Sequence, residues 1–139
     1  MTDPDLIAKK LAAIRDYIGE LRLKARPDEL ETDVRERRFV EHTLQLAIQA
    51  ALDVASHIVS DERLGEPRTN RQLFALLEGG GWIQSDLSSR LQQMAGFRNI
   101  LVHGYDVVDL GIVRDILAHR LDDLLELVAA VETRVSRDS

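Results

Sequence analysis

The segment from Leu30 to Val59 contains neither proline nor glycine, so nothing in it prevents one uninterrupted helix. Its apolar side chains recur at steps of three and four residues, which places them on one helix face. These positions are Leu44, Ala47, Ile48, Ala51, Leu52, Ala55, Ile58 and Val59. Alanines line one side of this face, where a second helix can approach closely. The segment therefore predicts a long helix that forms the spine of a bundle or an oligomer interface.

Four other segments show helix spacing. Three of them begin at residues typical of helix starts, namely Asp3 with Pro4, Ser85 with Asp86, and Asp109. Three are followed by helix breakers, which are Pro27, Gly79–Gly81 and Gly104. The expected helices cover 4–24, 69–78, 85–103 and the chain from 109 onward.

Composition agrees with a helical fold. Aromatic residues make up only 4% of the chain while aliphatic residues are plentiful, and no segment alternates as a strand would. A chain of 139 residues has room for one hydrophobic core. We therefore predict one all-α domain over residues 1–139, an up-and-down bundle of four long helices and one short helix.

Several functional classes are excluded. The chain has no cysteine, so it forms no disulfide and no cysteine-ligated metal site. Its acidic start lacks an apolar signal core, and no apolar run approaches the roughly 20 residues that span a bilayer. We expect a soluble, cytoplasmic protein without membrane contact. The net charge of −6 counts against nonspecific nucleic-acid binding, so any contact with RNA must be local or shared with a partner.

Most of the other conspicuous features have structural explanations. Gly79–Gly81 lacks the Lys-Ser/Thr that a phosphate-binding loop requires, and we interpret it as a helix break. No histidine stands three or four residues from His42, His57 or His119, so none forms a helical metal pair. The Arg35–Arg38 run is interpreted as a solvated, salt-bridged helix face, although it could touch phosphates.

The carboxylates Asp122, Asp123 and Glu126 are expected opposite the apolar stripe of the last helix, in contact with solvent. Paired carboxylates used for acid–base chemistry require burial, which nothing in the sequence indicates. We therefore assign them no catalytic role.

Arg98, Asn99, His103 and Tyr105 lie within eight residues at the expected end of a helix. In a structural interpretation, His103 stabilises the negative end of the helix dipole, Gly104 ends the helix, and Arg98 forms a surface ion pair. In a functional one, His103 transfers protons and Arg98 stabilises charge on a phosphoryl group. Such a pair cleaves RNA through a 2′,3′-cyclic phosphate without a metal.

The spacing of Arg98 and His103 complicates the functional interpretation. Five residues along an α-helix correspond to a rotation of about 140° beyond one full turn, so the two residues do not share a face. They converge if the helix loosens near Gly104, if the substrate lies across the helix end, or if two chains form a shared cleft.

The run Arg98-Asn99-Ile100-Leu101-Val102-His103-Gly104-Tyr105 resembles the R-x-x-x-x-H-x-Y signature of HepT-type toxins in the HEPN superfamily. Residues 47–58 resemble the long second helix of that family, and residues 105–109 resemble its approach to the last helix. The similarity extends over nearly the whole chain.

The resemblance implies a HEPN-like homodimer that is the toxin of a bacterial toxin–antitoxin module and a metal-independent endoribonuclease. Arg98 and His103 would be catalytic at a cleft between protomers, with Asn99 in support and no cofactor. The partner would be a minimal nucleotidyltransferase (MNT) antitoxin that transfers AMP from ATP to Tyr105. A negatively charged nucleotide so close to His103 would repel an RNA phosphate.

Two alternatives remain open at this point. The chain could be a noncatalytic companion or substrate-binding subunit of a minimal nucleotidyltransferase, in which Arg98 and His103 are structural or bind nucleotide. It could also be a purely structural dimerisation module, but this leaves the polar cluster unexplained.

Overall fold

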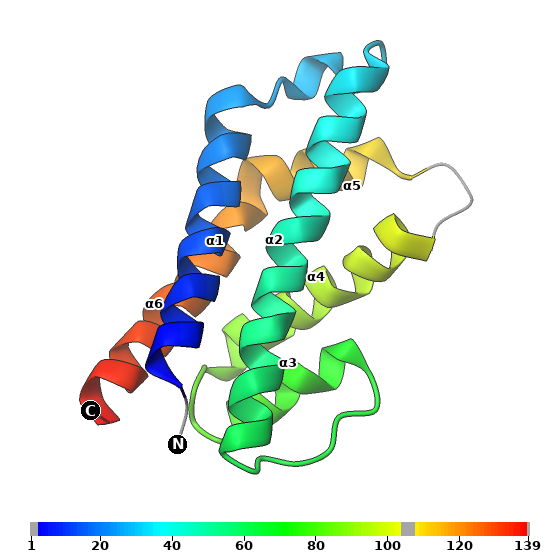
Figure 1. The fold of residues 1–139 in the computed structure, drawn as a ribbon. Helices are drawn as coiled ribbons and strands as arrows, with labels where there is room; N and C mark the ends of the chain where they lie inside the picture. Colours follow the sequence, from blue (N-terminus) through cyan, green and yellow to red (C-terminus); the bar gives the residue numbers. More distant parts are fainter. Residues whose placement is uncertain (1–2, 104–107, 139) are drawn as a thin grey trace.

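The computed structural model describes residues 3–103 and 108–138, apart from the side chains of Val102 and His103. Within these ranges the chain is helical and contains no strand, and Figure 1 shows long helices running up and down beside one another. The elements are α1 (Pro4–Lys24), η1 (Pro27–Glu29), α2 (Val34–Asp61), α3 (Asn70–Gly79), α4 (Ser85–His103), α5 (Leu110–Asp115), η2 (Ile116–Arg120) and α6 (Leu121–Asp138). Because α5, η2 and α6 adjoin, they form one long helix. Together with α1, α2 and α4 it makes four long helices, and α3 is the short one, so the predicted all-α bundle is confirmed.

Helix α1 begins and packs as its sequence predicts. The Asp3 carboxylate accepts hydrogen bonds from the backbone N–H groups of Asp5 and Leu6 at 3.0 and 3.3 Å. Pro4 occupies the first helical position, where its missing N–H costs no hydrogen bond. The apolar stripe of α1 is fully buried and consists of Ile7, Leu11, Ile14, Ile18 and Leu21.

Helix α2 begins later than the sequence pattern suggested. The expected start at Leu30 is wrong because Asp33 caps the helix, accepting from the N–H groups of Arg35 and Glu36 at 2.9 and 3.4 Å. Leu30 instead follows the 3₁₀ turn η1 and is completely buried there. At the other end, α2 extends to Asp61, beyond Val59.

The alanines of α2 pack inside this chain. Ala47, Ala51 and Ala55 are fully buried and Ala50 is 6% exposed, because α1, α3, α4 and α6 all contact α2. The close approach predicted at the alanine edge therefore occurs between helices of one protomer. The alanine edge is consequently unavailable as a dimer interface.

The last helix contains an irregularity that the sequence did not predict. Asp109 caps it as expected, since its carboxylate accepts from the Gly111 N–H at 2.8 Å. Residues Ile116–Arg120 then form a π-helical segment, η2, between α5 and α6. Such segments are frequent at functional sites. Among the described residues, no helix is both long and apolar enough to cross a membrane.

We predict that Leu44→Ala in α2 lowers the free energy of unfolding by about 2–5 kcal/mol, because Leu44 is completely buried and the substitution leaves a cavity. Urea unfolding followed by circular dichroism measures the change. The matched control is Leu23→Ala in α1, where the leucine is 81% exposed and the expected change is within about 0.5 kcal/mol. Equal losses in the two variants would contradict this account of the core.

Candidate active site

Helix α4 presents the candidate site on a helix that is firmly seated along its length. Its buried side chains are Leu87, Ser88, Leu91, Met94, Ala95 and Phe97. The Ser88 hydroxyl also donates to the carbonyl of Phe74 in α3 at 3.3 Å. Toward the carboxyl end of α4, Asn99 is exposed and the Ile100 side chain is 49% exposed. This end of α4 therefore has an open face.

Arg98 carries a charge that no carboxylate among the described residues neutralises. Its side chain is half-buried, and its Nε atom is buried without a hydrogen-bond partner. Buried polar nitrogens normally have a partner, and none of the described residues supplies one here. The interpretation of Arg98 as a surface ion-pair partner is not supported by any carboxylate in the described ranges.

Asn99 connects α4 to the first turn of α3. Its side-chain oxygen accepts a hydrogen bond from Asn70 Nδ2 at 3.4 Å. Asn70 is the first residue of α3 and follows the capping Thr69, whose hydroxyl accepts from the Gln72 N–H at 3.3 Å. The start of α3 is thus held beside the end of α4.

The backbone of α4 is α-helical as far as His103. Positions 98 and 103 therefore project about 140° apart and about 7.5 Å along the helix axis. No loosening of the helix between them brings them together, which leaves a substrate across the helix end or a cleft between two chains. Gly104 and Tyr105, the predicted helix stop and modification site, lie outside the described residues.

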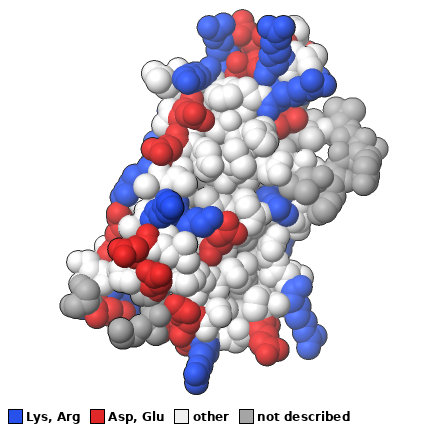
Figure 2. Space-filling model, viewed as in Figure 1, with Lys and Arg blue, Asp and Glu red and all other residues white. Residues whose placement is uncertain are grey.

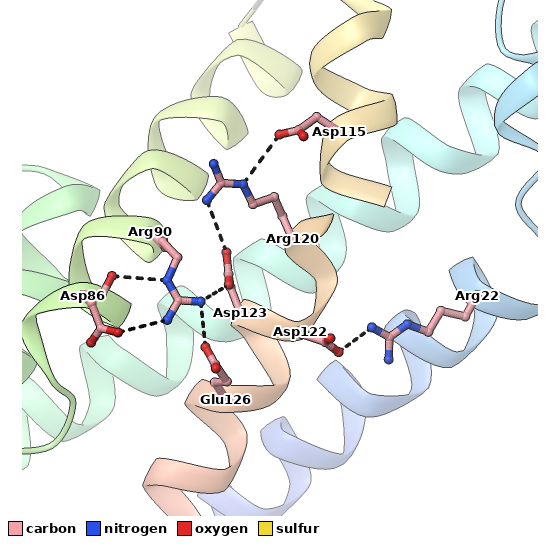
Figure 3. A network of polar contacts seen from close by, with 8 residues as sticks. All are labelled: Arg22, Asp86, Arg90, Asp115, Arg120, Asp122, Asp123 and Glu126. Atoms are coloured by element: carbon pink, nitrogen blue, oxygen red, sulfur yellow. Dashed lines mark hydrogen bonds and ion pairs between the residues drawn. The ribbon is translucent and has the colours of Figure 1, made fainter. Parts of the chain in front are cut away.

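A network of charged side chains fixes α4 against the last helix (Figure 3). Its members on these two helices are Asp86, Arg90, Asp115, Arg120, Asp123 and Glu126. Arg90 of α4 lies at the centre: it hydrogen-bonds to Asp123 and donates to Glu126 at 2.8 Å. Arg120 of η2 approaches the other Asp123 oxygen at 4.0 Å. The network therefore ties α4 to both η2 and α6.

The expectation that Asp123 contacts solvent is wrong. Asp123 is 3% exposed, because it precedes the buried Leu127 by one helical turn and lies at the edge of the apolar stripe. That four-residue spacing was the sequence signal that could have revealed it. Burial raises the pKa of Asp123, and the charge and hydrogen bond of Arg90 offset part of this rise. Asp122 is exposed as expected and pairs with Arg22 at 2.5 Å.

The other candidate residues occupy structural positions. His42 and His119 are exposed, and His57 Nε2 lies 3.2 Å from the Asp61 carboxylate. In the described part of the chain, no three histidine or acidic side chains are grouped as a metal site.

The basic run Arg35–Arg38 lies at the start of α2. Arg35 and Arg38 are exposed there, and Glu36 accepts a hydrogen bond from the Arg26 N–H at 2.8 Å. Figure 2 shows basic side chains gathered at this end of the molecule, with acidic ones among them. The run therefore lies on a solvated helix face, as the sequence predicted, but its predicted salt bridges are not found among the described residues.

A groove of about 630 Å³ lies between α6 and the start of α4, and Trp82, Arg90, Glu126 and Arg134 are among its lining residues. The Arg134 guanidinium covers the Trp82 ring at 4.7 Å from its centre. Neither Arg98 nor Asn99 lines this groove, so the candidate site is a helix face and not this cavity.

The helical bundle superposes on that of a solved HEPN toxin, so the chain has a HEPN-type fold. A family model described as "Ribonuclease HepT-like" matches residues 7–131. The chain belongs to this ribonuclease HepT-like family.

Relatives of known identity support the same placement. The mRNA nuclease HepT of Shewanella oneidensis is 31% identical over 129 residues, which is 92% of this chain and 97% of that protein. The tRNA nuclease HepT of Aphanizomenon flos-aquae is 30% identical over 109 residues, covering 77% of this chain and 74% of that protein. Among solved structures, the tri-AMPylated HEPN toxin of Shewanella oneidensis in complex with MNT antitoxin superposes with a TM-score of 0.87 at 30% identity, over 94% of this chain and 99% of that one.

We predict that Asp123 makes stability depend on pH. Its pKa is raised in the folded state, so the folded chain holds this proton more tightly than the unfolded chain does. The contribution of Asp123 is therefore greatest in acid and declines as pH rises through the folded pKa. The free energy of unfolding of the wild type, minus that of Asp123→Asn, should fall as pH rises above about 4, the usual pKa of an aspartate.

The control for this experiment is Asp122→Asn, which removes an exposed carboxylate from the adjacent position. Urea unfolding across the same pH range compares the two variants. If the free energy of unfolding of the wild type, minus that of Asp123→Asn, grew with pH, the pKa of Asp123 would be lowered by folding and not raised.

Proposed function

We propose that this chain is the toxin of a toxin–antitoxin pair and a cytoplasmic endoribonuclease that cleaves RNA without a metal ion. One observation carries the proposal: Arg98, on the helix that ends at His103, has a buried Nε without a hydrogen-bond partner and no ion pair among the described residues. The relatives named as mRNA and tRNA nucleases support the activity.

The proposed chemistry needs only a proton carrier and a cation. The 2′-hydroxyl oxygen attacks the adjacent phosphorus, the bond to the 5′-oxygen breaks, and a 2′,3′-cyclic phosphate remains. His103 accepts the 2′-hydroxyl proton or supplies a proton to the departing oxygen, because imidazole titrates near neutral pH. Arg98 stabilises the charge that develops on the phosphoryl oxygens, and Asn99 assists by hydrogen bonding.

The proposed site is formed between two copies of the chain. Arg98 and position 103 lie on different faces of α4, so one protomer does not direct both toward one phosphate. In a two-fold dimer, two α4 helices facing one cleft contribute both residues. Ile100, 49% exposed on α4 between Arg98 and His103, is the apolar surface that such a dimer would bury.

The proposed antitoxin is a minimal nucleotidyltransferase. The Shewanella HEPN toxin in complex with MNT antitoxin carries AMP groups, which supports the same form of control here. Tyr105 is the proposed acceptor: its phenol oxygen attacks the α-phosphorus of ATP, and pyrophosphate leaves. The attached phosphate and nucleotide then exclude RNA from the neighbouring His103 by charge and by bulk.

We predict that Arg98→Ala and His103→Ala each abolish cleavage of RNA. Loss of general acid–base catalysis alone lowers rates by about 10²–10⁴-fold. Gel analysis of RNA incubated with each purified variant measures the loss, and wild-type cleavage should persist in EDTA. Both variants should retain the helical circular dichroism and the wild-type mass, near twice 15.7 kDa by light scattering.

Two results would overturn the mechanism. Full activity of the double variant would exclude Arg98 and His103 from catalysis, and a strict requirement for Mg²⁺ would exclude cleavage without a metal. An inactive wild type that still binds the nucleotidyltransferase would favour the noncatalytic companion instead.

We predict that incubation with the cognate nucleotidyltransferase, ATP and Mg²⁺ adds AMP to Tyr105. Tyr105→Phe should remain an active nuclease, because the phenol is not a catalytic group, and should escape modification. The control is Tyr17→Phe. Tyr17 is half-buried against the hydrophobic core, so this substitution should leave modification of Tyr105 unchanged. Peptide mass spectrometry locates the adduct, and an adduct on Tyr17 would refute the assignment.

A further inference from the structure

A second arginine reaches α4 from the neighbouring helix. Arg71, in the first turn of α3, is exposed and rests its guanidinium against Gly96 of α4. A Cβ at Gly96 would lie no more than 3.0 Å from the Nη2, Cζ and Nε atoms of Arg71, so any other residue there would displace the guanidinium from this position. Glycine is a poor residue for a helix interior, and here the space left by its missing side chain is occupied by the Arg71 guanidinium.

Arg71 lies on the same face of α4 as position 103. Position 103 comes seven positions after Gly96 in the helix. The two positions therefore point within about 20° of the same direction and lie about 10 Å apart along the helix axis. Asn99 lies between them, within about 40° of position 103. Arg98, by contrast, projects about 140° away from that position. Within one protomer, Arg71 is therefore the arginine that shares the face of His103.

The charge of Arg71 is available to a ligand. No ion pair joins it to a carboxylate within residues 3–103 and 108–138, whereas Arg90 on the same bundle contacts three acidic side chains. The hydrogen bond from Asn70 to Asn99 holds the preceding residue of α3 against α4. Arg71 is thus unneutralised, and the backbone that carries it is placed beside α4.

We propose that Arg71 binds a backbone phosphate of RNA beside the scissile one, on the face of α4 that includes position 103. A guanidinium recognises phosphate through two parallel N–H···O hydrogen bonds, which suits this role. The proposal rests on the proposed nuclease function and extends it. It gives an acidic chain a local contact with RNA: Arg71 anchors the strand, while Arg98 and His103 act on the bond that breaks.

The first test measures binding without cleavage. The probe is a fluorescein-labelled, mixed-sequence single-stranded RNA of about 12 nucleotides, a length within the site sizes of single-strand binding proteins. Its affinity for the His103→Ala protein is measured by fluorescence anisotropy at several salt concentrations. Arg71→Ala should weaken binding by about tenfold at low salt. The slope of log K against log salt should become shallower by about 0.7, the value for one phosphate contact on a single strand.

Two further variants separate a specific contact from a change in net charge. Arg137→Ala removes an equal charge from the far end of α6, remote from the end of α4 (Figure 1), and should leave affinity and slope unchanged. Gly96→Ala keeps the charge but displaces the Arg71 guanidinium, so it should weaken binding, though by less than Arg71→Ala does. The double variant Arg71→Ala/Gly96→Ala should bind no more weakly than Arg71→Ala alone.

In chains that retain His103, Arg71→Ala should raise KM for RNA with little change in kcat, because the contact is equally strong before and during cleavage. Equal effects of Arg71→Ala and Arg137→Ala, or no measurable binding by the parent, would overturn the proposal. A wild type that binds with the expected Arg71 dependence but does not cleave would refute the nuclease function and leave the Arg71 contact standing.

Discussion

Burial of helix α2 is the constraint on which the rest of the structure depends. Its apolar residues spread over more than one face, and α1, α3, α4 and α6 all pack against it. Because a helix this apolar must be covered, the other helices are arranged around it. The alanines of α2 let these neighbours approach closely, and these alanines are buried by helices of the same chain. Any interface with a second copy must therefore use another surface, and α4 offers the exposed Ile100.

Four arginines that lie on α4 or beside it differ in their ion pairing. Arg90 and Arg120 are neutralised by carboxylates of α4, η2 and α6, and they fix the position of the site helix. Arg71 of α3 lies against α4 near its carboxyl end, and Arg98 belongs to that end of α4 itself. Neither has such a partner among the described residues. A net charge of −6 is therefore compatible with a local anion-binding face, because two arginines near the carboxyl end of α4 have no carboxylate partner among the described residues.

The regularity of α4 shapes the proposed mechanism. A helix that continues to His103 separates Arg98 from position 103 by about 140°, so one chain alone presents an incomplete site. Pairing of two α4 helices resolves this geometry, and it also explains why an apolar side chain stands between two polar residues of the motif. In the proposed control by AMP, a single modification near position 103 then affects a cleft that both chains share.

The sequence alone determined the helices, because capping residues, breakers and three- and four-residue spacing act locally. It also singled out Arg98, Asn99, His103 and Tyr105, since their cluster lies within one short segment. It misplaced the start of α2, where Asp33 supplies a cap inside an otherwise continuous pattern, and it missed the π-helical segment at Ile116–Arg120.

Only the tertiary structure decided the remaining features of the site. The ion pair of Asp123 with Arg90 joins two helices, and the contact of Arg71 with Gly96 joins residues far apart in the chain. Local spacing carries no information about which helices become neighbours. That choice follows from how the apolar faces of all the helices together cover α2, and it brings Arg71 to the face of α4 that includes position 103.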